Sequence, residues 1–111
     1  MAAAPQQLRI TVRPSPLAAG FHHLLTFPVV ELDGVARRIV WGAPTALPLT
    51  GPQHRLSVYF RYRGQRSTRL GEGRAVLETV AAPAVLEVRA QLGVRNSSTF
   101  RITGPGVGSR R

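Results

Sequence analysis

Apolar and polar side chains alternate one by one along several stretches of this 111-residue chain. The longest case is HRLSVYFRYR (54–63), where every second side chain from Leu56 to Tyr62 is apolar. LRITVR (8–13) and residues 84–92 follow the same pattern. A period of two places neighbouring side chains on opposite faces of an extended chain, so it predicts half-buried β-strands rather than amphipathic helices.

Prolines and glycines separate these stretches, and Asp33-Gly34 has the chemistry of a tight hairpin turn. We expect RGQRSTRLGEGR (63–74) to form an exposed loop, with a brief extended stretch near Arg69. Pro28 is expected at a sheet edge or a bulge, because proline cannot donate a ladder hydrogen bond. The expected strands are residues 8–13, 21–32, 38–41, 45–49, 54–63, 75–80, 84–92 and 98–103. Seven or eight short strands predict a single antiparallel β-sandwich of the immunoglobulin or fibronectin kind, with a small β-barrel as the alternative.

The length corresponds to one domain, which we place at residues 7–103. Residues 1–6 are expected to be a flexible N-terminus, and GPGVGSRR (104–111) a flexible basic tail. No stretch approaches the roughly 18 apolar residues of a membrane helix, and the N-terminus lacks the layout of a signal peptide. A cytoplasmic location without a transmembrane segment is therefore expected. Cysteine is absent, which excludes disulfides and thiolate sites.

The basic residues are all arginine, and fifteen of them stand against five acids, for a net charge of +10. Residues 51–111 carry eleven of these arginines and three of the acids, so most of the excess lies in the second half. The lack of lysine is typical of a high-GC bacterium. Codon usage does not explain the shortage of acids, and an excess of this size indicates an acidic partner rather than a requirement of the fold.

The candidate binding residues share one strand and the loop after it. They are Arg55, Tyr59, Arg61, Arg63, Arg66, Arg69 and Arg74. In one interpretation the guanidinium groups bind phosphates of a polyanion while an exposed Tyr59 ring stacks on bases. In the other, Tyr59 packs beneath its arginine neighbours on a solvated face. Trp41 either lines a groove or, as we favour, plugs the end of the core.

Catalytic residues are not apparent. Glu31 and Asp33 are the one close carboxylate pair, but Asp33 also suits the turn. His22 and His23 would point to opposite faces of a strand, so a metal site completed by His54 would need a bulge. We therefore expect no catalytic residue, no metal site and no cofactor, and the chain is not expected to be an enzyme.

VVELDG (29–34) and GAPTALPLTGPQHRLSVYF (42–60) together resemble the repeat of PEGA-type β-sandwich domains. In that family a strand ends in Asp-Gly, and a Thr-Pro-Leu-like segment, a Pro-Gly turn, a histidine and an alternating strand follow. The residues in comparable places are Asp33, Gly34, Thr45, Leu47, Leu49 and His54. The resemblance covers residues 29–63. It implies a β-sandwich that acts as a small extracytoplasmic or surface-anchored interaction module, usually within a larger protein.

Three hypotheses for function follow. The first is a non-catalytic binding or scaffold module that recognises a protein, acidic or otherwise, through an arginine-rich sheet face or an exposed edge. The second is non-specific binding of nucleic acid or another polyanion, which would weaken steeply with salt. The third is a structural subunit of an oligomeric assembly.

Overall fold

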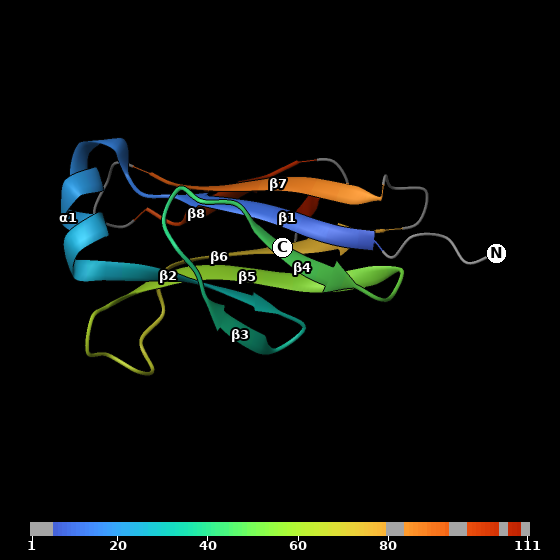
Figure 1. Cartoon of the computed structure of the whole chain (residues 1–111), viewed down its shortest axis with the longest axis horizontal. Coiled ribbons are helices and arrows are strands. Elements are labelled where there is room, and N and C mark those ends of the chain that lie inside the picture. The colour runs from blue at the N-terminus through green and yellow to red at the C-terminus, as the bar shows by residue number, and fades with distance from the viewer. Residues whose placement is uncertain (1–5, 80–83, 94–97, 105–106, 110–111) are drawn as a thin grey trace.

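The chain folds into two facing β-sheets in a computed structural model, which describes residues 6–79, 84–93, 98–104 and 107–109 (Figure 1). The four-stranded sheet has the order β4-β1-β7-β8, with β4 at Thr45–Leu49, β1 at Gln6–Arg13, β7 at Val85–Leu92 and β8 at Phe100–Thr103. The five-stranded sheet has the order β3-β2-β5-β6-β9, with β3 at Val35–Arg38, β2 at Thr26–Leu32, β5 at Gln53–Tyr62, β6 at Leu70–Glu78 and β9 at Val107–Ser109. No described strand belongs to both sheets, so these strands form no closed barrel.

The core fills the space between the sheets with the alternate apolar side chains. Leu8 and Ile10 of β1 and Val58 of β5 have no exposed surface, and burial of a side chain of this kind contributes about 1.5–3 kcal/mol. Trp41 closes one end of this core. Its ring stacks on Phe100, and its indole N–H donates to Thr26 Oγ1 at 3.2 Å. Trp41 is therefore a plug rather than the wall of a groove.

The mostly β character of the fold is confirmed, but the expectation of purely antiparallel pairing is wrong. β1 pairs with β7 in parallel, in a register that runs from Gln7 opposite Val85 to Arg13 opposite Gln91. A parallel pair needs a long crossover, and here the chain passes through α1 and the strands from β2 to β6, four of them in the five-stranded sheet, before it returns as β7.

The expected strand over residues 21–32 begins as a helix. A short 3-10 turn, η1 (Pro16–Ala18), leads into α1 (Ala19–Leu25), which covers one end of the core (Figure 1). The helical sequence AGFHHLL contains no β-branched residue, and β2 begins at the first one, Thr26. No helix among the described residues has both the length and the apolar character to cross a membrane.

The Asp33-Gly34 turn is confirmed, with φ of 52° and 85°, and β3 follows it directly. The strand expected at residues 38–41 therefore lies earlier, at Val35–Arg38. Pro28 is not on an edge strand, because β2 pairs with both β3 and β5. The Pro28 carbonyl accepts a hydrogen bond from the Ile39 N–H at 3.0 Å. Because the nitrogen and the carbonyl of one residue point to the same side of an antiparallel strand, the Pro28 nitrogen, which has no hydrogen to donate, faces the chain just after the end of β3.

Residues from three segments expected to be irregular belong to strands. β6 begins at Leu70, inside the expected loop. Residues 107–109 of the expected tail pair with β6 as β9, and Gln6 of the expected flexible N-terminus belongs to β1. Residues 1–5, 80–83, 94–97, 105–106 and 110–111 lie outside the described residues.

A bulge at Gly71 decides which side chains of β6 face outward. Val58 pairs with Gly73 but Phe60 pairs with Leu70, so β6 has one residue more than β5 over this interval. Gly71 has a φ of 64°, in the left-handed region. Arg69 and Arg74 are separated by an odd number of positions and would face opposite ways on a regular strand. The extra residue brings both to the outer face and turns Leu70 inward.

We predict that Gly71→Ala destabilises the fold by about 1–2 kcal/mol. A side chain is strained at this φ, and its Cβ would lie 2.9 Å from Leu92 Cδ1 and 3.3 Å from the Phe60 ring. Urea unfolding measures the change. Gly20→Ala is the matched control, since a Cβ on Gly20 meets nothing within 4 Å and alanine suits a helix. Equal stability of the two variants would contradict the bulge.

Candidate binding surface

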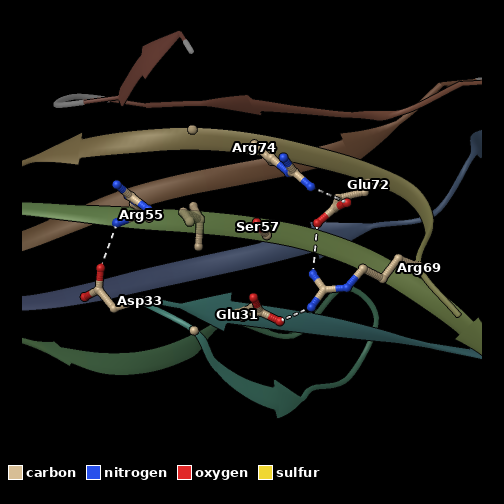
Figure 2. Close-up of a pocket in the computed structure, with 10 residues that line it drawn as sticks. Glu31, Asp33, Arg55, Ser57, Arg69, Glu72 and Arg74 are labelled. Carbon is tan, nitrogen blue, oxygen red and sulfur yellow. Dashed lines mark hydrogen bonds and ion pairs between the residues drawn. The ribbon is translucent and has the colours of Figure 1, made fainter. Parts of the chain in front are cut away.

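The arginine face is the outward side of the five-stranded sheet. It consists of Phe27, Glu31, Arg38, Arg55, Ser57, Tyr59, Arg61, Arg69, Glu72 and Arg74. Part of it is an open pocket of about 690 Å³, lined by residues of β2, β5, β6 and the Asp33-Gly34 turn (Figure 2). The alternation of each strand places these side chains outward, while their inward neighbours Val30, Leu56 and Val58 belong to the core.

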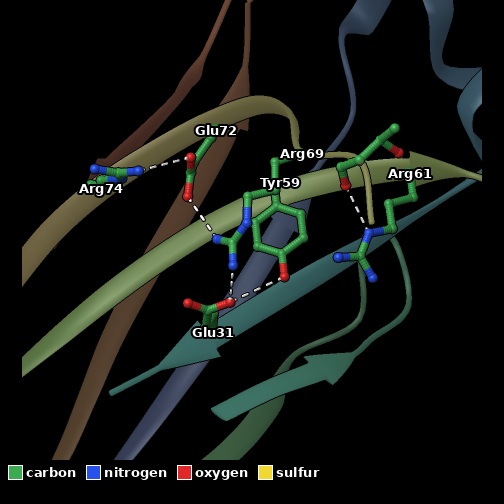
Figure 3. Close-up of polar contacts among 7 residues, drawn as sticks. Glu31, Tyr59, Arg61, Arg69, Glu72 and Arg74 are labelled. Carbon is green, nitrogen blue, oxygen red and sulfur yellow. Dashed lines mark hydrogen bonds and ion pairs between the residues drawn. The ribbon is translucent and has the colours of Figure 1, made fainter. Parts of the chain in front are cut away.

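Tyr59 is fully buried although it points outward. The Arg69 guanidinium lies 4.6 Å from the centre of its ring and the Arg61 guanidinium 5.1 Å. Its hydroxyl donates to Glu31 Oε2 at 3.2 Å (Figure 3). The stacking role considered for an exposed Tyr59 is therefore wrong, because two arginines and a carboxylate already cover this ring.

Arg69 is the centre of an ion-pair network. Its two terminal nitrogens donate to Glu31 Oε2 at 2.7 Å and to Glu72 Oε2 at 3.0 Å. Arg74 donates to the other oxygen of Glu72 at 3.2 Å (Figure 3). The hydrogen bond to Glu31 raises the pKa of Arg69 above its usual value. Burial raises the pKa of Tyr59, and the Glu31 carboxylate adds to that rise. The charge of Arg69 is thus largely compensated within the chain.

The other candidate arginines differ in their contacts. Arg61 Nε donates to the Thr68 carbonyl at 2.7 Å. Arg63 Nε donates to the Leu24 carbonyl at 2.9 Å and so links the end of β5 to α1. The Arg55 backbone N–H donates to Asp33 at 2.8 Å (Figure 2), while its side chain, like that of Arg66 in the following loop, is exposed. The seven candidate residues therefore do not form one uniform patch.

Arg38 is not among the seven candidate residues, although the sequence left open that Arg37-Arg38 extends the patch or sits in a loop; its guanidinium lies 4.0 Å above the Phe27 ring. The register places Phe27 opposite Arg61 and Val29 opposite Arg38. Arg38 and Arg61 thus stand on neighbouring rows of the same face. The hairpin turn at Asp33-Gly34 sets the Arg38 register, so counting outward from the turn could have found this residue.

Every carboxylate side chain of the chain has a partner within the described residues. Glu31 and Glu72 bind Arg69, Asp33 binds His54, Glu87 pairs with Arg9 at 3.4 Å, and Glu78 accepts from Gln53. The arginines whose guanidinium group has no carboxylate oxygen within 4 Å in residues 6–79, 84–93, 98–104 and 107–109 are Arg13, Arg37, Arg38, Arg55, Arg61, Arg63, Arg66, Arg89 and Arg101. The uncompensated charge is thus distributed over both sheets.

A buried His54 side chain and an exposed Asp33 carboxylate form a hydrogen-bonded pair at the rim of this pocket. Asp33 Oδ2 accepts from His54 Nδ1, and His54 Nε2 accepts from the Gly51 N–H at 3.2 Å. Desolvation opposes ionisation of Asp33, but the hydrogen bonds from the Arg55 N–H and His54 together lower its pKa. Both imidazole nitrogens are occupied, so this pair holds the β2–β3 turn against β5 and leaves no nitrogen free for a substrate.

The histidines considered as metal ligands lie at opposite ends of the molecule. His22 lies in α1, whereas His54 lies near the start of β5 (Figure 1). The described residues contain no group of three or more histidine or acidic side chains that could hold a metal ion.

No protein-family model, curated protein or solved structure matches the chain. The resemblance of residues 29–63 to PEGA-type domains therefore stays a prediction.

We predict that Glu31→Gln lowers the pKa of Tyr59 and destabilises the fold by about 1 kcal/mol or less, since Arg69 is partly solvent-screened. Tyr62 is the one other tyrosine, so the titration is followed in a Tyr62→Phe background. The pKa of Tyr59 in the folded protein lies above the usual tyrosine value of 10.0. The contribution of Tyr59 to the free energy of unfolding is therefore complete below pH 10 and is lost as pH rises through the folded-state pKa.

Glu78→Gln removes the same charge at a site where the one hydrogen bond to the Glu78 side chain comes from Gln53, among the described residues. It should leave the Tyr59 titration unchanged. A Tyr59 that titrates alike in both variants would show that Glu31 does not bind its hydroxyl.

Proposed function

We propose that the chain is a non-catalytic binding module that recognises an acidic protein segment through the arginine face. The observation that carries this proposal is the state of Arg38 and Arg61. Each guanidinium lies over an aromatic ring, Phe27 or Tyr59, and neither has a carboxylate within 4 Å in the described part of the chain.

These two side chains suit carboxylate ligands. A guanidinium is planar and can donate two parallel hydrogen bonds to one carboxylate. Its side chain normally loses rotamer freedom on binding, but stacking on a ring has already restricted that freedom in the free protein. Arg61 is held further by its bond to the Thr68 carbonyl. Binding therefore costs these two side chains less conformational entropy than it would cost a mobile surface arginine, and more of the hydrogen-bond free energy remains as affinity.

The composition of the face favours a protein over nucleic acid. Tyr59 is buried and cannot stack on a base. Glu31, Asp33 and Glu72 lie among the arginines that line the pocket, and these carboxylates would repel a phosphate backbone. A segment with mixed polar and acidic side chains can avoid them.

The arrangement of two facing sheets supports a β-sandwich of the immunoglobulin or fibronectin kind. The resemblance of residues 29–63 to PEGA-type domains supports an interaction role for such a fold. The edge strand β3 has all its side chains exposed and places Arg38 on the arginine face, while Arg37, opposite the core residue Val30, lies on the other face of the sheet. The arginine face is therefore open to a partner that approaches from this edge.

The test measures binding of an Asp- and Glu-rich peptide by fluorescence anisotropy. We expect the double variant Arg38→Ala, Arg61→Ala to bind at least about tenfold more weakly, which corresponds to about 1.4 kcal/mol. The matched control is Arg89→Ala, Arg101→Ala, which removes the same charge from the four-stranded sheet. An equal loss in both double variants would mean that net charge alone binds the peptide.

Two alternatives are tested alongside. Tighter binding of single- or double-stranded DNA than of the peptide, at about 50 mM salt, would favour the nucleic-acid hypothesis over this proposal. A scattering mass well above the 12.0 kDa of the chain would favour an oligomeric subunit.

A further inference from the structure

A second pocket, of about 410 Å³, lies beside α1 and is lined by residues of both sheets. Its walls include Phe21 and His22 of α1, Phe60 and Tyr62 of β5, and Leu70 and Leu92. Phe60 and Tyr62 follow the inward alternation of β5, but Tyr62 is 40% exposed, so the core is open here. The volume is within the range of small-ligand sites.

The rings of this pocket stand edge to face. His22 meets Phe60 at 4.9 Å and Phe21 at 5.6 Å between ring centres, and Phe21 meets Tyr62 at 5.9 Å. Another ring entering the pocket would find both faces and edges of these aromatics, the arrangement in which aromatic pairs are favourable.

The hydrogen bonds around Thr26 determine the tautomer of His22. The Thr26 hydroxyl donates its one proton to the His22 carbonyl at 2.8 Å. Its oxygen must then accept from both other neighbours, His22 Nδ1 at 3.1 Å and the Trp41 N–H at 3.2 Å. His22 therefore carries its proton on Nδ1, and in the neutral ring Nε2 is an acceptor.

His22 Nε2 has no hydrogen-bond partner among the described residues, although the residue is 94% buried. No fully buried side-chain nitrogen or oxygen in that part of the chain lacks a partner. The atom must therefore reach solvent, and His22 lines this pocket. A ligand that donates a hydrogen bond to Nε2 would replace water there, while the rings of Phe21, Phe60 and Tyr62 offer it apolar contacts.

We propose that this pocket binds an aromatic ring that carries an O–H or N–H donor, with the donor bonded to His22 Nε2. The ring would pack among Phe21, Phe60 and Tyr62. The site uses none of the arginine face, so it stands whether or not the proposed acidic partner binds there. A phenol or indole group could come from a free small molecule or from a tyrosine or tryptophan of a partner.

The first experiment compares p-cresol with p-methylanisole by NMR titration. The two have the same ring, but the anisole lacks the donor. We expect p-cresol to shift signals of Phe21, His22 and Phe60, with a Kd in the millimolar range that suits so small a ligand. The anisole should bind at least about fivefold more weakly. Equal affinities, or shifts elsewhere only, would overturn the proposal.

Two variants test the contacts. His22→Phe keeps a ring but removes the acceptor, and should erase the preference for p-cresol over p-methylanisole. Ala18 lines the pocket, so Ala18→Leu should block both probes. Thr103→Ala, on β8, is a folded control that should leave both affinities unchanged. A preference for p-cresol that persists in folded His22→Phe would contradict the assignment of Nε2.

Acid should also abolish the preference. Burial lowers the pKa of His22, with a further contribution from His23 on the same helix. The ionisable groups near this ring on the neighbouring strand and loop are Tyr62 and Arg63. Once pH falls through the His22 pKa, Nε2 is protonated and can no longer accept. A p-cresol preference that is unchanged at acid pH, while the chain remains folded, would overturn the proposal.

A capped Gly-Tyr-Gly peptide, titrated in the same way as p-cresol, tests whether the bound ring belongs to a partner protein or to a free small molecule. If the peptide binds in the pocket as well as p-cresol does, the site accepts a side chain of a partner protein. If p-cresol binds and the peptide is excluded, the site takes a free small molecule.

Discussion

The bulge at Gly71 is the constraint on which both candidate sites depend. One extra residue in β6 reverses the alternation between Leu70 and Gly73. Arg69 thereby joins the outer face, where it covers Tyr59, and Leu70 turns inward to line the pocket beside α1. Only glycine adopts the required φ without strain. A regular strand would exchange the two side chains and would expose Tyr59.

The arginines on the outer face of the five-stranded sheet fall into two groups, one that stabilises the fold and one that is available to a ligand. The net charge of the chain does not separate these groups. Arg69 is bound by Glu31 and Glu72 and contributes to the structure. Arg38 and Arg61 are ordered by aromatic rings rather than by carboxylates, so their charge remains available to a ligand. This division explains how a chain with a net charge of +10 can have a stable network on the very face that carries its candidate binding residues.

The sequence predicted correctly those elements whose structure depends on neighbouring residues. Alternation predicted the β5 segment, and Asp-Gly chemistry predicted the β2–β3 turn. The sequence did not predict the elements whose structure depends on contacts with distant parts of the chain. Residues 107–109 are glycine-rich and become a strand because β6 offers them an edge. The Gly71 bulge and the parallel β1–β7 pair likewise depend on partners far along the chain.

The candidate site was predicted in part for the same reason. Alternation placed Arg55, Tyr59 and Arg61 on one face of β5, as found. It could not show that Tyr59 is buried, because the covering arginine, Arg69, directly precedes β6 and reaches this face only through the bulge. The sequence did not predict the pocket beside α1, because residues 21–25 were expected to be part of a strand rather than of a helix.

The most direct test is a nuclear Overhauser spectrum of the native chain. The account predicts contacts between the Arg69 side chain and the Tyr59 ring, together with contacts from Leu70 to Phe60 and Leu92. Contacts of Leu70 with the Tyr59 ring instead, with Arg69 directed toward Leu92, would show that β6 has no bulge and would contradict both proposed sites.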